Sequence, residues 1–213
     1  MAEFEIQRDR MVREVEARGV SDPRVLDAMR RVPRHLFVGR PFVAQAYGSF
    51  RLPSEADQTL SQPYVVGRTT ELLELDPRHV VLEVGSGTGY QTAILARLCR
   101  WVFGMERVPS LASAAIERLR DLKVDNVKIQ AFDGTLGWSK NAPFDRILVT
   151  ASVRRVPPPL LEQLSPTGRL LIPEGDRTSQ RLVLYTRAGR RFERHVGEEA
   201  AFVPLIGQHG WKS

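Results

Sequence analysis

Residues 82–90 constrain the fold of this chain more than any other stretch. They read Leu-Glu-Val-Gly-Ser-Gly-Thr-Gly-Tyr and close an apolar run over 80–84. Apolar residues at helical spacing follow between 93 and 98. This pattern predicts a strand that turns sharply into a helix, with glycines where backbone approaches a ligand closely. A strand, a glycine-rich turn and a helix in this order are typical of a doubly wound α/β sheet.

A second apolar run, over 101–105, ends in the acid Glu106. It lies about twenty residues after the glycines, where an acid is placed to hydrogen-bond a ribose diol. The dinucleotide fingerprint fails, because its sixth position needs glycine and is Tyr90 here. The phosphate-binding loop G-x-x-x-x-G-K-[ST] is absent from the sequence as well. We therefore expect a site for a nucleoside that carries no phosphate.

The acid before the first glycine, Glu83, narrows the ligand class further. A carboxylate at this place repels a pyrophosphate but suits a cationic group. S-adenosyl-L-methionine fits, because it combines adenine and ribose with an ammonium and a sulfonium. The alternative is a glycine-rich turn that binds no ligand.

Bulk properties set the broad class of the protein. The chain has 213 residues with 42% hydrophobic content, which suits a single domain with a substantial core. No apolar run approaches the roughly 20 residues that span a bilayer, and the charged start lacks a signal-peptide core. We therefore expect a cytoplasmic protein without membrane contact. Cys99 is the only cysteine, so no internal disulfide and no cysteine metal cluster can form.

The net charge of +6 raises the possibility of a nucleic-acid partner. The arginines, however, form scattered pairs among acids, with no aromatic-interleaved basic stripe. The Asn/Asp-Pro-Pro-Tyr/Phe element of amino-group nucleic-acid methyltransferases is also missing from the sequence. We expect a solvated basic surface and no nucleic-acid partner.

Hydrophobic periodicity predicts helices first and then alternating strands and helices. Helices are expected from residue 4 to Gly19, from the Ser21-Asp22-Pro23 cap to Pro33, and over 64–75. The stretch 34–63 shows no sustained period and is expected to be a long irregular segment. The remaining predicted elements are strands 80–84, 101–105, 127–131, 146–150, 169–172, 181–186 and 191–196, and helices 90–99, 110–121 and 158–164. They predict a mostly parallel Rossmann-like sheet that ends in an antiparallel hairpin.

Motifs along nearly the whole chain resemble those of the protein-L-isoaspartate (D-aspartate) O-methyltransferases. The specific element is Gln58-Thr59-Leu60-Ser61-Gln62-Pro63-Tyr64, because the glycine loop alone indicates only some methyltransferase. Further anchors are 32–38, 82–91, Asp133-Gly134, Gly137-Trp138, 143–145, 149–151 and Phe202-Val203-Pro204-Leu205. The resemblance implies one methyltransferase domain over 1–213, with a helical and active-site segment, 1–75, and a cofactor-binding core, 76–213.

The resemblance also implies a reaction and its participants. Methyl transfer from S-adenosyl-L-methionine to L-isoaspartyl and D-aspartyl carboxyls would begin the repair of damaged proteins and leave S-adenosyl-L-homocysteine. The expected partners are isoaspartyl peptides and proteins, and a monomer is expected. Ser61 matches the active-site serine. The matched cofactor residues are Thr59, Leu60, Glu83, Gly85, Ser86, Gly87, Gly89, Glu106, Arg107, Asp133, Gly134 and Gln180.

One segment departs from the family pattern. Many members have Tyr-x-Asp and then Leu-Pro-Ile-Gly before the glutamine-threonine element. Here 47–57 reads Tyr-Gly-Ser-Phe-Arg-Leu-Pro-Ser-Glu-Ala-Asp, so the acid is displaced, Ile-Gly has become Ser-Glu, and Asp57 replaces a small residue. The altered 48–57 segment raises the alternative of a related enzyme that methylates another carboxylate or a small molecule. An alternative from another class is a non-catalytic cofactor-binding protein.

The chemistry itself makes few demands on the side chains. A carboxylate acceptor is already ionised at pH 7, so positioning and exclusion of water are the main requirements. The four histidines are far apart, and no metal site is expected. Ser61 is expected to orient the carboxylate, although a helix N-cap before Pro63 is the alternative. Thr150, at the tip of the fourth strand, is expected at the edge of the active site.

Overall fold

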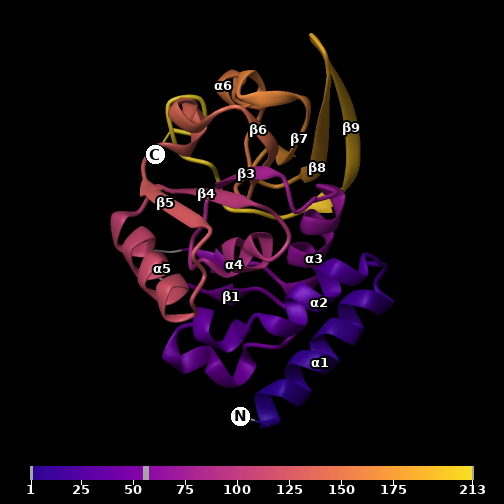
Figure 1. Cartoon of the computed structure of the whole chain (residues 1–213), viewed down its shortest axis with the longest axis vertical. Helices are drawn as coiled ribbons and strands as arrows, with labels where there is room; N and C mark the ends of the chain where they lie inside the picture. The colour runs from indigo at the N-terminus through magenta and orange to yellow at the C-terminus, as the bar shows by residue number, and fades with distance from the viewer. Residues whose placement is uncertain (1, 55–57, 213) are drawn as a thin grey trace.

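A computed structural model describes residues 2–54 and 58–212 of the chain. At its centre is a seven-stranded sheet (Figure 1). In spatial order the strands are β5 (Val127–Ala131), β4 (Trp101–Glu106), β3 (Val80–Val84), β6 (Phe144–Val149), β7 (Leu164–Gly175), β8 (Gln180–Ala188) and β9 (Arg191–Ala200). β5 to β7 run parallel in this order, whereas β8 and β9 join as antiparallel neighbours. The predicted α/β class and the carboxyl-terminal hairpin are therefore confirmed.

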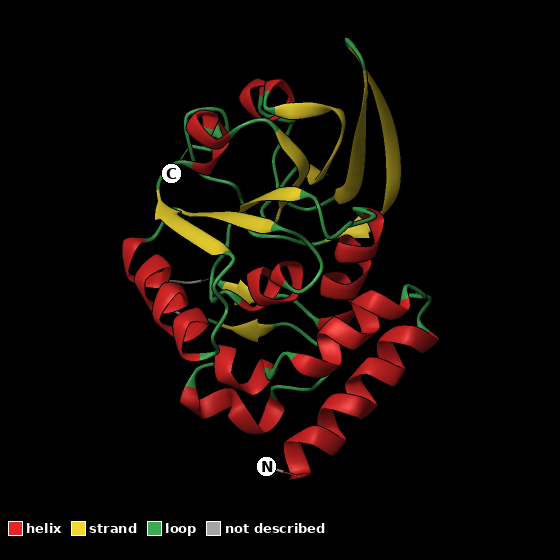
Figure 2. Ribbon diagram, viewed as in Figure 1, coloured by secondary structure: helices red, strands yellow, loops and turns green. Residues whose placement is uncertain are grey.

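Helices cover the sheet on both faces (Figure 2). The crossover helices α4 (Tyr90–Ala96) and α5 (Pro109–Asp121) join β3, β4 and β5, and α6 (Pro158–Glu162) precedes β7. In β3, Val81 packs in one apolar cluster with Leu95, and the next residue, Leu82, packs in another with Leu160. Successive residues of a strand point to opposite faces, so β3 is buried from both sides.

The helices α1 (Ala2–Ala17), α2 (Pro23–Arg31) and α3 (Pro63–Leu72) pack together beside α4 (Figure 1). The helix α2 begins where the sequence predicts it. The Asp22 carboxylate accepts a hydrogen bond of 2.9 Å from the backbone N–H of Arg24, and Pro23 is the first helical residue. The Phe37 ring meets the edge of Tyr90 at 5.4 Å between centroids, which fixes this helical layer against the start of α4.

The stretch 34–63 is more regular than the sequence predicts. It contains the 3₁₀ helices η1 (Arg34–Phe37) and η2 (Arg40–Gln45) and an antiparallel pair of two-residue strands, β1 (Leu52–Pro53) and β2 (Thr59–Leu60). Elements this short leave no hydrophobic period in a sequence. The pairing of Leu52 with Leu60 brings the segment before residue 55 beside the segment that contains Ser61. The altered residues 55–57, including Asp57, lie outside the described residues.

Some predicted boundaries are wrong by several residues. The strand expected over 169–172 extends over all of β7, because Pro166 and Gly168 hide its first half in the sequence. The helices expected over 158–164 and 90–99 end early, at Glu162 and Ala96. Among the residues that the model describes, no helix is both long and apolar enough to cross a membrane.

Candidate active site

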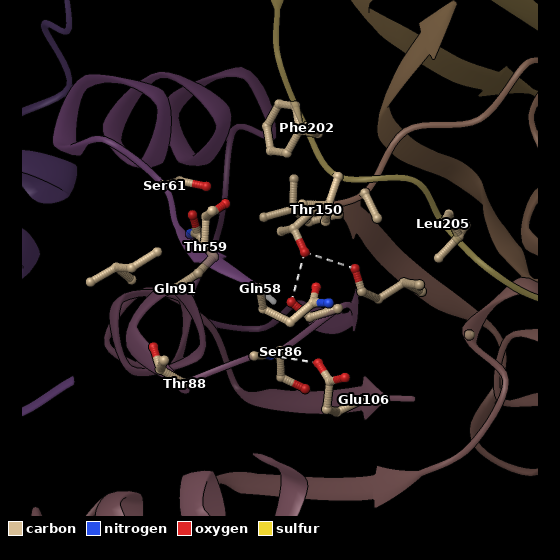
Figure 3. Close-up of a pocket in the computed structure, with 18 of the residues that line it drawn as sticks. Gln58, Thr59, Ser61, Ser86, Thr88, Gln91, Glu106, Thr150, Phe202 and Leu205 are labelled. Atoms are coloured by element: carbon tan, nitrogen blue, oxygen red, sulfur yellow. Dashed lines mark hydrogen bonds between the residues drawn. The ribbon is translucent and has the colours of Figure 1, made fainter. Parts of the chain in front are cut away.

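The direction in which successive strands are added to the sheet reverses between β3 and β6. The chain adds β4 and β5 on one side of β3, and then adds β6 and β7 on the other side. Open α/β sheets bind ligands at the carboxyl ends of their strands at such a switch point. A pocket lies there, walled by segments from both halves of the sequence (Figure 3). Its lining residues are 58–61, 65, 66, 69, 84–88, 90, 91, 105–108, 134, 148, 150, 151 and 202–206.

The glycine loop after β3 forms the floor of this pocket. Gly85 and Gly87 have φ angles of +93° and +51°, which side-chain-bearing residues rarely adopt. A Cβ atom on Gly85 would lie 2.4 Å from Oγ1 of Thr150. That hydroxyl lies 3.0 Å from the carbonyl oxygen of Val84 and 2.7 Å from that of Gly85. The glycine is therefore needed for the close approach of β3 and β6 as well as for the turn.

The Glu106 carboxylate lies at the end of β4, where the sequence places a ribose-binding acid. It is 6% exposed, and each oxygen accepts a hydrogen bond of 2.9 Å from a backbone N–H, that of Gly87 for Oε2 and that of Val108 for Oε1. These bonds orient the carboxylate in the pocket wall. Each oxygen keeps a lone pair that can accept a hydroxyl. Exposed Arg107 lines the pocket beside it.

The segment with Ser61 lies at the other end of the pocket from Glu106 in Figure 3. The N-cap of α3 is Gln62, and its side chain makes no cap hydrogen bond. The alternative role of Ser61 as the helix cap is therefore wrong, because the serine precedes the cap by one residue. Thr59 and Leu60, which pair as β2 with β1, line the pocket next to it.

The stretch 202–206 borders the pocket near Ser61 and Thr150 (Figure 3). It is held against the end of β6, where the backbone of Ser152 exchanges hydrogen bonds of 2.8 Å with Val203 and Leu205. The side chain of Gln180 also fixes it, because its amide bonds both the N–H of Phe202, at 2.7 Å, and the carbonyl of Phe202, at 3.1 Å. These bonds place the Phe202 ring over the pocket.

Four of the expected cofactor residues do not reach the pocket wall. The side-chain amide of Gln180 forms its hydrogen bonds with the backbone of Phe202. The Asp133 carboxylate binds Thr135 and the N–H of Gln208, so it fixes the chain's own loops. Gly89 is the N-cap of α4, and its φ of +88° is a backbone conformation that favours glycine. Their neighbour Gly134 does line the pocket, and a Cβ there would lie 2.4 Å from Val84.

Glu83 is the fourth expected cofactor residue that does not reach the pocket wall. It was expected to present a negative charge to the ligand. It is fully buried, and the Thr92 hydroxyl donates a hydrogen bond to its Oε2. Burial raises the pKa of Glu83 to about 8, and the Glu106 carboxylate acts in the same direction. The carboxyl is therefore mostly neutral at pH 7, and the expected charge is not displayed.

Because the pKa of Glu83 is raised in the folded protein, we expect the free energy of unfolding to depend on pH. Its folded pKa lies above the ordinary value of 4.5, so the folded protein binds the proton more tightly than the unfolded chain. The stabilisation is fully present below about pH 4.5 and is lost as the pH rises toward 8. Urea unfolding should show wild type losing stability relative to Glu83→Gln over this range, at a slope of up to about 1.4 kcal/mol per pH unit. A constant difference would mean that the native carboxyl is ionised.

Sequence reasoning missed several lining residues. Thr88 stands between two of the glycines, and Tyr90 and Gln91 follow the last one, so their position in or beside the motif was a usable signal. Residues 202–205 belonged to the resemblance, but the sequence assigned them no role. Thr150, expected at the site edge, does line the pocket.

Comparison with known proteins identifies the family. A family model described as protein-L-isoaspartate(D-aspartate) O-methyltransferase (PCMT) matches residues 6–210. The chain belongs to this family. It is 48% identical to a protein-L-isoaspartate O-methyltransferase of Magnetococcus marinus, over 96% of this chain and 90% of the relative. It is 47% identical to protein-L-isoaspartate O-methyltransferase 1 of Syntrophobacter fumaroxidans, over the full length of both.

Solved structures of family members have the same fold. A protein-L-isoaspartate O-methyltransferase superposes with a TM-score of 0.87 at 26% identity, over 95% of this chain and 67% of that one. A putative enzyme of the family from Plasmodium falciparum, in complex with S-adenosyl-L-homocysteine, gives a TM-score of 0.82 at 24% identity. The latter covers 93% of this chain and 98% of that one.

The pocket fits the adenosyl cofactor of the family. Ser86 is 4% exposed and lines the pocket, yet its hydroxyl has no partner within the described parts of the chain, so a polar ligand group can satisfy it. At Gly87 an added Cβ would meet only the carbonyl oxygen of Gly85, at 4.0 Å, so the loop is open there. Glu106 supplies acceptors suited to a diol, and the described residues of the wall include no cluster of cations for a phosphate.

Proposed function

We propose that this protein transfers a methyl group from S-adenosyl-L-methionine to the free carboxyl of L-isoaspartyl and D-aspartyl residues in damaged proteins. Membership of the family supports the reaction. The observation that carries the assignment to this pocket is its wall, which combines the glycine loop and Glu106 with the Ser61 segment and the Phe202 stretch. A cofactor end and an acceptor end are thus continuous in one cavity.

The lining residues divide by their place in the pocket. Glu106 would hold the ribose, the loop 85–88 would hold the methionine part of the cofactor, and Gly134 would face the base. Thr59, Leu60 and Arg107 would enclose the cofactor. Ser61 would donate its hydroxyl to one acceptor oxygen and so aim the other oxygen at the methyl group. We propose that 1–75 and 76–213 act as one domain, because both contribute to this wall.

Little acid–base chemistry is needed in this site. The bound cofactor supplies an electrophilic methyl group on a sulfonium, and its sulfur departs neutral. The acceptor carboxylate is ionised at pH 7, so no side chain has to remove a proton. What the chain contributes is orientation and exclusion of water, since Leu205, Phe202 and Leu60 form apolar parts of the wall. The expected monomeric state, cytoplasmic location and lack of a nucleic-acid partner stay predictions.

A comparison of two peptides tests the proposal. One peptide carries an isoaspartyl linkage and the other the normal aspartyl linkage in the same sequence, and both are incubated with methyl-labelled cofactor. We expect base-labile label on the isoaspartyl peptide only. Label on neither peptide, with cofactor binding intact, would favour another acceptor, the alternative raised by the altered 48–57 segment, or a non-catalytic binding protein.

A further inference from the structure

A fully buried arginine, Arg34, lies behind the acceptor end of the pocket. It is 0% exposed and stands at the start of η1. Its Nε donates a hydrogen bond of 2.8 Å to the carbonyl of Ala46, and its Nη2 donates one of 2.7 Å to the carbonyl of Ser61. The guanidinium also lies 4.7 Å from the ring centroid of Tyr90, which lines the pocket. One side chain thus connects η2, the Ser61 segment and the start of α4.

The charge of Arg34 has no counter-ion within residues 2–54 and 58–212. Its hydrogen bonds go to neutral carbonyls, and its Nη1 has no partner there. The nearby groups that stabilise its charge are the phenols of Tyr90 and Tyr47. Burial raises the pKa of both phenols, so they are neutral and do not compensate the arginine. Burying an unpaired cation is costly, which makes this placement unusual for a purely structural residue.

A second buried arginine shows the contrast. Arg146 is 9% exposed and also donates only to carbonyls, those of Leu73, Glu74 and Asp145. The acids Asp145, Glu74 and Asp76 stabilise its charge, whereas the nearby Arg169 opposes it. It lies near the amino end of β6, at the sheet edge opposite the pocket. Arg146 is therefore a suitable control for Arg34. It is also a buried arginine, but it has acidic neighbours and does not line the pocket.

We propose that Arg34 is a positioning residue for the methyl acceptor. It holds Ser61 in place, and its charge, which has no counter-ion among the described residues, favours binding of an anionic carboxylate. The inference rests on the proposed function, because it needs a carboxylate substrate at the Ser61 end. An incoming carboxylate would supply the missing negative charge, and in a low-dielectric environment the attraction extends beyond direct contact. The cofactor has less need of this charge, since the carboxylate of its methionine part is balanced by its own ammonium group.

The test separates charge from packing. The enzyme, loaded with S-adenosyl-L-homocysteine, is titrated with a labelled isoaspartyl peptide and with the isoasparaginyl peptide, whose neutral carboxamide has nearly the same shape. Wild type should prefer the carboxylate, and Arg34→Met should reduce this preference by roughly tenfold. Arg34→Lys keeps the charge but loses the geometry by which one side chain binds the carbonyls of both Ala46 and Ser61. It should keep the preference within about threefold of wild type and lower kcat through a less fixed Ser61.

Arg146→Met and Arg146→Lys are the matched controls. They should lower the melting temperature without changing the carboxylate preference. Affinity for S-adenosyl-L-homocysteine should change by less than about threefold in both Arg34 variants, because no cofactor group is held by Arg34. If wild type methylates the isoaspartyl peptide but lacks the preference, or if Arg34→Met and Arg34→Lys both retain it, this inference is wrong and the proposed function stands. If wild type labels no isoaspartyl peptide, the proposed function fails first.

Discussion

Replacing Ser61 by alanine is expected to lower kcat on an isoaspartyl peptide by on the order of 100-fold, the scale seen when one positioned donor is lost. Affinity for S-adenosyl-L-homocysteine, measured by calorimetry, should stay within about threefold of wild type, because the hydroxyl lies at the acceptor end. The fold should tolerate the change. Gln62, not Ser61, is the N-cap of α3, and the bond from Arg34 goes to the Ser61 carbonyl, which alanine retains.

Ser165→Ala is the matched control for this experiment. The Ser165 hydroxyl is buried and has no partner among the described residues, and it lies at the amino end of β7, away from the pocket. It should leave kcat, cofactor affinity and melting temperature close to wild type. Equal losses of kcat and cofactor affinity in Ser61→Ala would contradict an orienting role and indicate a general collapse of the segment.

The second large effect is expected from Gly85→Ala, which should weaken binding of S-adenosyl-L-homocysteine by on the order of 100-fold or more. The backbone at Gly85 has a φ of +93°, a conformation that costs an alanine about 1–3 kcal/mol. The new Cβ would also lie 2.4 Å from the Thr150 hydroxyl, so the loop or the end of β6 must move. Either movement displaces groups that line the cofactor end of the pocket.

Two further variants separate strain from collision. Gly19→Ala has a similar φ of +105°, but its Cβ would meet nothing within 4 Å. It should lower the melting temperature slightly and leave cofactor affinity unchanged. In the double variant Gly85→Ala/Thr150→Ala the colliding hydroxyl is gone, so part of the lost affinity should return as a favourable coupling. Wild-type affinity in Gly85→Ala alone would show that the close approach at this turn is not needed.

The acidic residues show how far single-sequence reasoning reached. Glu106 was located correctly at the pocket wall, because its distance from the glycines places it at the end of the neighbouring parallel strand. Glu83 and Asp133 follow the same logic of strand ends, yet neither reaches the wall. The Glu83 side chain is buried against Thr92. The Asp133 side chain is held by Thr135 and by the backbone of Gln208. A motif fixes the position of a backbone segment, but not the partner that a carboxylate will find in three dimensions.

The sequence by itself determined the class of fold, the strand that carries the glycine loop and the chemical class of the ligand. These features depend on the hydrophobic periodicity of single elements and on the spacing of residues within short motifs, and both can be read from a short stretch of sequence. Only the tertiary structure decided which segments complete the pocket. The stretch 202–206 and the Ser61 segment, which only the resemblance had placed at the site, reach it from far along the chain. Contacts such as those of Gln180 with Phe202 and of Arg34 with the Ser61 carbonyl hold them there. Such contacts depend on how the sheet and helices pack, and no periodicity of the sequence encodes them.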